Sequence, residues 1–210
     1  CSVCSSPFGP ILRLCAARLS MRWGLPCILA SKRPILLQGN MNVSGEKATV
    51  DGLISMLQEG TRLWRAELGG CSAGAVAWQP FRHGHNIGGL LLHVGEVEGY
   101  WIEEVVAGRQ RVATELRLLR AADTDSSRGR WASPYEDWSL ARYYEVLDQV
   151  RDRTLATLSE QESAGKVFQG PDGPVALHSI VTRLISHESY HAGQMMLHKL
   201  HHGWNGIEPA

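Results

Sequence analysis

The chain has 210 residues, of which 44% are hydrophobic and 20% are charged, values typical of a globular protein with one substantial core. Its 21 basic and 21 acidic residues balance, so no net charge favours binding to nucleic acid or to an anionic membrane. No apolar run approaches the roughly 20 residues that a membrane-spanning helix needs, so we expect no membrane association.

The N-terminal region differs in composition from the rest of the chain. Residues 1–45 contain no acidic residue, and four of the five cysteines lie in the first 27 residues. A targeting segment, a cysteine-bearing metal or disulfide module, and an extension without structure of its own are three interpretations of residues 1–40. We favour the third, because this segment shows no sustained helical or strand period. The domain is then expected to span 41–210, and its single cysteine, Cys71, fits a reducing, cytoplasmic compartment.

Two helices are predicted in the first half of this domain. Apolar residues recur at three- and four-residue steps over 47–68, and Gly69-Gly70 then ends the pattern. After a loop rich in Gly, Ala and Ser, Asn86 is a suitable N-cap for a second helix over 87–107. The apolar stripe of this second helix comprises Ile87, Leu90, Leu91, Val94, Val97, Trp101 and Val105.

Two further helices are predicted after a long connection, 108–134, which holds one short helix in VATELRLLR. Ser139 or Asp137 is expected to cap a third helix over 138–163. Residues 165–174 are interpreted as a loop, and Pro174 suits the first turn of a fourth helix over 174–202. Because no alternating strand pattern is found, we predict an all-α fold, a four-helix bundle with a long crossover between helices two and three.

The stretch HESYH, residues 187–191, carries the strongest chemical signal. His187 and His191 lie about 40° apart around a helix and one turn apart along it, so both imidazoles can reach one metal ion. Their face also carries Leu177, Ile180 and Leu184, which indicates that the pair points into the bundle. Buried imidazoles require either a metal ion or hydrogen-bond partners.

A usable metal site needs a third ligand, and His93 is the best candidate. It lies midway along the predicted second helix, on the flank of its apolar stripe. His198 and His178 lie roughly 10 Å or more along the helix axis from the pair, too far for the same ion. His201 and His202 are expected to be solvated, and His83 and His85 are expected to be loop residues near the mouth of the site.

H-E-x-x-H is also the zinc motif of many metalloproteases, in which the glutamate, here Glu188, is the general base. The longer metzincin motif requires a glycine and a third histidine where this chain has Gln194 and Leu197. For the other large class, only Glu208 remains downstream as a glutamate ligand. A zinc metalloprotease is therefore the least favoured hypothesis.

The blocks HNIGGLLLHVGEVEGYWI (85–102) and LISHESYHAGQMMLHKL (184–200) resemble the DinB/YfiT-like superfamily of metal-binding four-helix bundle proteins. The resemblance covers about 46–204 and implies that His93, His187 and His191 bind a divalent metal ion, with zinc or nickel favoured. It leaves Gln194 and Glu188 as candidate catalytic residues: Gln194 either supports a ligand or contacts substrate, while the likeness of Glu188 to a protease base would be incidental. Gly193 would let another helix or a substrate approach closely, and plain helix packing is the alternative for both Gly193 and Gln194.

Three neutral imidazoles leave a metal ion with open positions, an arrangement typical of catalytic sites. The resemblance implies a metal-dependent enzyme of thiol S-transferase or hydrolase type, with a small-molecule substrate, a low-molecular-weight thiol co-substrate and a homodimeric assembly. The alternative is a non-catalytic metal-binding stress-response bundle. Four tryptophans could line a pocket or a dimer contact, although helix packing explains each of them as well: Trp78, Trp131, Trp138 and Trp204.

Overall fold

The computed structural model describes residues 49–79, 84–125 and 128–203, so the predicted extension 1–40, His83 and Trp204 lie outside the described residues. Its elements are α1 (Val50–Leu68), α2 (Ala73–Ala77), α3 (Ile87–Gly99), the π-helical η1 (Tyr100–Val106), α4 (Ala113–Leu118), the 3-10 turn η2 (Ala121–Asp123), α5 (Leu140–Ser159), β1 (Val167–Gly170), β2 (Gly173–Ala176) and α6 (Leu177–His201). The predicted all-α class is confirmed, with one small hairpin added.

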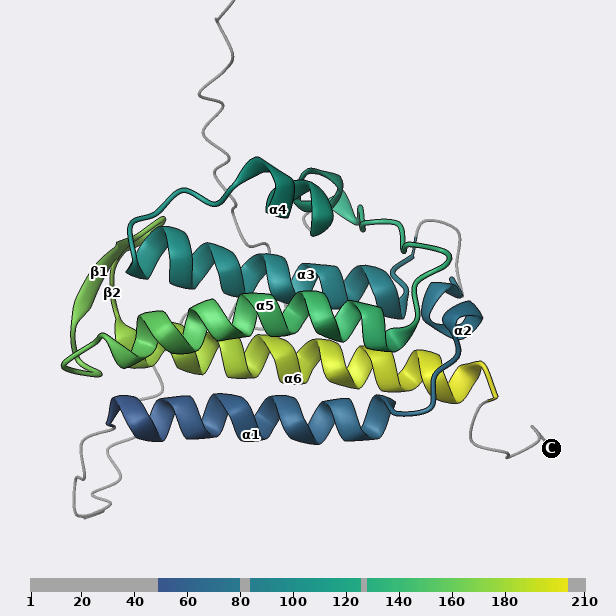
Figure 1. The fold of residues 1–210 in the computed structure, drawn as a ribbon, viewed down its shortest axis with the longest axis horizontal. Coiled ribbons are helices and arrows are strands. Elements are labelled where there is room, and N and C mark those ends of the chain that lie inside the picture. The colour runs from purple at the N-terminus through teal and green to yellow at the C-terminus, as the bar shows by residue number, and fades with distance from the viewer. Residues whose placement is uncertain (1–48, 80–83, 126–127, 204–210) are drawn as a thin grey trace, which may run out of the picture.

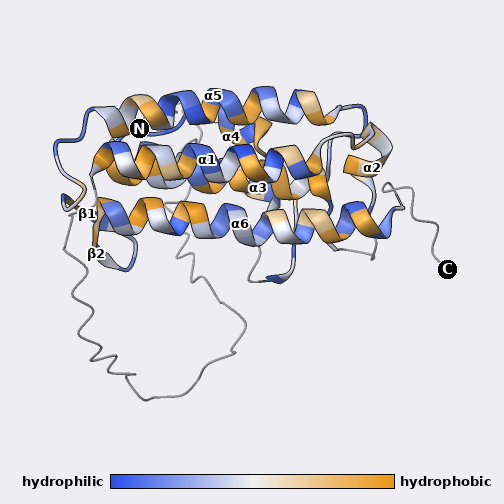
Figure 2. Cartoon of the chain, turned by 90° about the horizontal axis from the view of Figure 1, so that it is seen from below, coloured by the Kyte–Doolittle hydropathy of each residue, from blue (hydrophilic) through white to orange (hydrophobic). Residues whose placement is uncertain are grey.

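The four long helices, α1, α3, α5 and α6, lie side by side (Figure 1). Helix α1 packs against α6 and α5, and α3 packs against the same two helices. In Figure 2 hydrophobic and hydrophilic residues alternate along α1, α5 and α6, as expected for helices that bury one face. No helix in the described ranges is long and apolar enough to cross a membrane.

Helix α3 is the most enclosed element. The sequence predicted one apolar stripe, whereas every residue from Ile87 to Gly99 is buried. The long connection covers the remaining side of α3, and glycines make this possible. A Cβ at Gly89 would collide with the carbonyl oxygen of Ala132, and one at Gly88 would come within 3.0 Å of Pro134 besides colliding with the Tyr143 hydroxyl of α5. The connection therefore lies directly on the α3 backbone.

The helix starts follow the predicted caps. The side chain of Asn86 accepts a hydrogen bond from the Gly89 backbone N–H at 2.7 Å, and Ser139, rather than Asp137, caps α5. The second helix also continues as predicted beyond α3, but as the π-helical η1. A π turn shifts the helical phase, so Val106 is buried where the stripe predicted Val105.

The prediction of a loop over 165–174 and of Pro174 in the first helical turn was wrong. Strands β1 and β2 form an antiparallel hairpin in which Val167 pairs with Ala176 and Gln169 pairs with Pro174. A proline is tolerated in this two-stranded sheet because each strand has an unpaired edge. Helix α6 consequently begins three residues later than predicted, at Leu177. The short helix α2 was not predicted either.

Candidate metal centre

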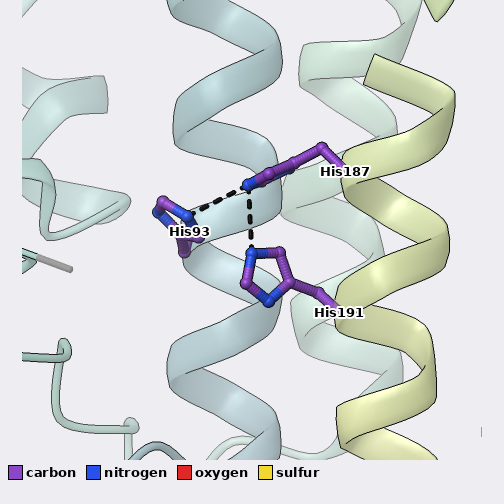
Figure 3. A group of neighbouring side chains, drawn as sticks. All are labelled: His93, His187 and His191. Carbon is purple, nitrogen blue, oxygen red and sulfur yellow. Dashed lines mark hydrogen bonds between the residues drawn. The ribbon is translucent and has the colours of Figure 1, made fainter. Parts of the chain in front are cut away.

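Three histidines from two helices converge between α3 and α6 (Figure 3). His93 projects from α3, and His187 and His191 project from α6, one turn apart. The Nε2 atom of His187 lies 3.1 Å from Nε2 of His93 and 3.0 Å from Nε2 of His191. In the described part of the chain, this is the only group of three His, Cys, Asp or Glu side chains whose ligand atoms all lie within 4.8 Å of one another. The structure thus brings the three predicted residues together.

The environment of these histidines keeps them uncharged. His93 and His191 are buried, while His187 is partly exposed. Burial lowers the pKa of His93 to about 3, that of His187 to about 2 and that of His191 to about 4. At neutral pH each ring therefore carries a nitrogen lone pair, the form in which imidazole binds metal.

Gln194 fixes the orientation of one member of the group. Its side-chain oxygen lies 2.6 Å from Nδ1 of His191, and its amide nitrogen donates to the Tyr190 hydroxyl at 3.2 Å. Because a carboxamide oxygen only accepts, Nδ1 of His191 carries the proton and Nε2 is left with its lone pair. That lone pair points toward His187. Gln194 is thus placed to orient the His191 ring.

Trp131 forms a wall beside the histidines. Its ring meets those of His93 and His191 edge to face, with centroid distances of 5.5 and 5.9 Å. This residue comes from the long connection, which the glycines of α3 allow to lie against that helix. The sequence favoured simple packing for Trp131 over a pocket or a dimer contact, and only the paired glycines of α3 indicated that another segment approaches that helix closely.

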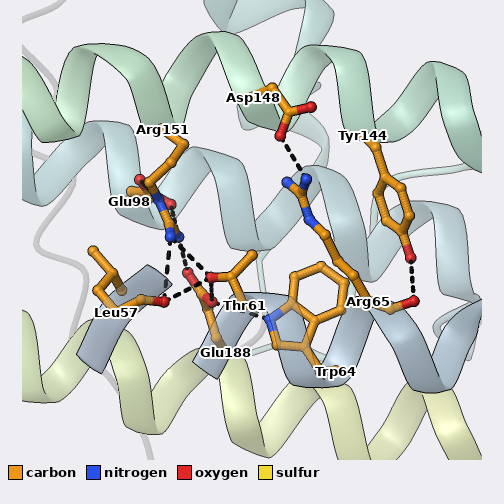
Figure 4. Close-up of polar contacts among 9 residues, drawn as sticks. All are labelled: Leu57, Thr61, Trp64, Arg65, Glu98, Tyr144, Asp148, Arg151 and Glu188. Carbon is orange, nitrogen blue, oxygen red and sulfur yellow. Dashed lines mark hydrogen bonds and ion pairs between the residues drawn. The ribbon is translucent and has the colours of Figure 1, made fainter. Parts of the chain in front are cut away.

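Glu188, the glutamate of the HESYH motif, faces a different part of the core (Figure 4). Its carboxylate accepts hydrogen bonds from Thr61 at 2.7 Å, from the Trp64 indole at 3.1 Å and from Arg151 at 2.5 Å. Arg151 also donates to the Glu98 carboxylate at 2.7 Å. Burial raises the pKa of Glu188, and the Arg151 guanidinium opposes that shift. Glu188 is therefore directed toward α1 and α5, whereas the histidines face α3.

This buried contact has a positional consequence for the site. Residues 187 and 188 point about 100° apart around a helix, so holding one side chain fixes the direction of the other. The contacts of Glu188 with α1 and α5 set the rotation of α6. In that rotation His187 and His191 meet His93.

Other predicted residues lie around the site without joining it. His85 precedes α3 and its ring lies 5.2 Å from that of Trp131, in keeping with the expected position near the mouth. His201 and His202 are exposed, as expected. Trp138 stacks on Tyr135 with a centroid distance of 4.1 Å, a packing role.

No other helix of the described residues packs against Gly193. It lies on the exposed side of α6, and no atom of the described residues comes within 4 Å of a Cβ placed there. Access for a substrate remains a prediction for this position.

A comparison with protein families adds independent support for the motif assignment. The family model described as Mycothiol-S-transferase matches residues 52–198, a span that covers most of the chain and all three converging histidines. No curated protein and no solved structure matches the chain.

Proposed function

The chain belongs to the mycothiol-S-transferase family, within the DinB/YfiT-like superfamily, and on that basis we propose that it is a metal-dependent thiol S-transferase. In this reaction a low-molecular-weight thiol loses its proton and its sulfur bonds to an electrophilic carbon of a second small molecule. The leaving group departs with its bonding electron pair. The observation that carries the proposal is the convergence of three uncharged imidazole nitrogens.

We propose that His93, His187 and His191 hold a divalent cation, with zinc or nickel favoured because imidazole suits both. The donor set fits, since the nitrogen separations of 3.0 and 3.1 Å approach the about 3.3 Å of two nitrogen ligands on tetrahedral zinc. Three neutral ligands leave the charge of the ion uncompensated, and that charge would acidify a thiol brought to its open side.

The surrounding side chains contribute access and orientation. The partial exposure of His187 would provide the approach for a substrate, while the Trp131 ring packs against the rings of His93 and His191. Tyr190, at the rim, offers an exposed hydroxyl that can bind a polar substrate group. Cys71, the one cysteine among the described residues, follows the end of α1 and is no member of the histidine group, so in the proposed reaction the sulfur is supplied by a small-molecule thiol.

Two finer features of the family resemblance are also part of the proposal. The four long helices and the crossover would adopt the DinB-like bundle topology, and two copies of the chain would form a homodimer. Exposed apolar side chains on α1 and α6 offer a surface for such a dimer: Met56, Leu63, Leu197 and Leu200. A monomeric mass in light scattering would reject the dimer.

The decisive experiment measures metal content and turnover in the same preparations. Wild type would be compared with His93→Ala, His187→Ala and His191→Ala, with His178→Ala as control, since His178 is exposed and bonds the Ala164 carbonyl instead. After loading with zinc or nickel, plasma mass spectrometry should find one ion per chain fewer in each triad variant than in wild type, and no loss in the control.

Turnover is then followed as consumption of a thiol in the presence of an electrophilic aryl halide. Activity that disappears with the metal supports the transferase. Metal binding without turnover of any thiol and electrophile pair would favour the non-catalytic alternative. Metal loss confined to the two α6 variants would contradict the cross-helix triad.

A further inference from the structure

A second pair of histidines lies along the same seam between α3 and α6. His85 stands just before α3, and His198 lies about two turns beyond His191 on α6. Their rings meet, with Nδ1 of His85 only 2.7 Å from Nε2 of His198. The start of α3 and the end of α6 thus bring imidazoles together much as the middles of the two helices do.

The end of α6 also repeats the spacing of the first site. His198 and His202 are four residues apart, as His187 and His191 are, and His201 lies between them. The rings of these three terminal histidines surround Trp78, with centroid distances of 6.2 Å for His198, 6.1 Å for His201 and 5.2 Å for His202. Further imidazoles therefore lie close to the fixed pair.

The pair itself is suited to binding a cation. Burial lowers the pKa of His85 and lowers that of His198 to about 4, so both rings are uncharged at neutral pH. The alternative to a metal site is a simple hydrogen bond between Nδ1 of His85 and Nε2 of His198. It does not account for the exposed His201 and His202 beside the same tryptophan.

We propose that His85 and His198 form a second metal site, for a cation that prefers imidazole, such as zinc, nickel or copper. His201 or His202 and water complete its ligands, after a rotation of the exposed side chain. This site is weaker than the triad because it fixes two imidazoles rather than three. The Trp131 ring contacts both His85 of the second site and His93 of the triad, and an indole N–H cannot bind a cation.

Calorimetric titration of the full chain with zinc alone tests this assignment. Wild type should bind two equivalents, one tight and one weaker. His85→Ala and His198→Ala should each lose the weaker equivalent and keep the tight one, and His178→Ala should keep both. His187→Ala should lose the tight equivalent and keep the weaker one, so failure of the triad and failure of the second site give different results.

Three outcomes would overturn the second site. The first is that wild type binds only one equivalent of zinc. The second is that the weaker equivalent is kept in both His85→Ala and His198→Ala. The third is that the weaker equivalent is lost in only one of these two variants. Circular dichroism identifies any variant that fails to fold. Because His85 precedes α3 and is only half-buried, His85→Ala remains interpretable even if replacement of the buried His198 disturbs α6.

Discussion

The hydrogen bond between His191 and Gln194 permits a direct test of how the triad is oriented. Gln194→Ala removes the oxygen that accepts from Nδ1 at 2.6 Å, so His191 is free to change tautomer and to rotate. Loss of such a supporting partner typically weakens metal binding by about 10- to 100-fold, or roughly 1.4 to 2.7 kcal/mol. The fold should be little affected, because Gln194 is partly exposed and alanine favours the helix.

The matched control is Gln194→Glu, which keeps an oxygen acceptor at the same position and adds a negative charge. Its affinity for zinc should equal or exceed that of wild type, because a carboxylate holds the same tautomer and makes the ring more basic. Competition against a chromogenic chelator at pH 7.5 measures all three affinities. Equal binding by wild type and the alanine variant, or equally weak binding by both variants, would refute the proposed role of Gln194.

Three further predictions concern stability, each measured by chemical denaturation of the metal-free protein. Glu188→Ala should lower the free energy of unfolding by about 2–4 kcal/mol, because the Trp64 N–H and Arg151 lose a buried acceptor; a loss below 1 kcal/mol would contradict this. Gly89→Ala should lower the free energy of unfolding by about 1–3 kcal/mol because the new Cβ collides with the Ala132 carbonyl, whereas Gly193→Ala, on open helix surface, should raise it by up to about 1 kcal/mol. Similar effects of the two substitutions would argue against the close contact between Gly89 and Ala132. The free energy of unfolding should fall as the pH drops from about 6.5 toward 4, because the three histidines take up protons in the unfolded chain but stay uncharged in the folded protein, where burial lowers their pKa values. A constant free energy of unfolding over that range would contradict the lowered pKa values.

Helices α1, α5 and α6 were predictable because their burial repeats with the helical period. In α5, for example, the buried residues include Tyr143, Leu147 and Val150, which stand at three- and four-residue steps. The hairpin was missed because each strand has only four residues, too few for an alternating pattern to stand out. The available signal was GPDG at 170–173, a two-residue turn between glycines, in which Gly173 adopts a φ of +121°.

The triad was accessible from sequence because two of its members share one helical face and the third has a mid-helix position. Its surroundings were not accessible in the same way. Trp131 reaches the site from the long connection, and His85 and His198 meet across 113 residues. No local period encodes such contacts, since they depend on how the connection crosses α3 and where α6 ends.

The resemblance of HESYH to a protease motif has a physical resolution in the rotation of α6. In a metalloprotease the glutamate must act at the metal, beside the two histidines. Here Glu188 is committed to Thr61, Trp64 and Arg151 on the two helices opposite. Within HESYH, His187 and His191 therefore lie on one face of α6 as ligand candidates, and Glu188 lies on another face, where its contacts hold the helix in place. Because the contacts of Glu188 fix the helix that carries the ligand candidates, weakening these contacts should also displace His187 and His191 and so lower the affinity for metal. Glu188→Gln, which retains the shape but removes the charge, is thus expected to lower metal affinity together with stability, and unchanged affinity in a destabilised variant would separate the two roles.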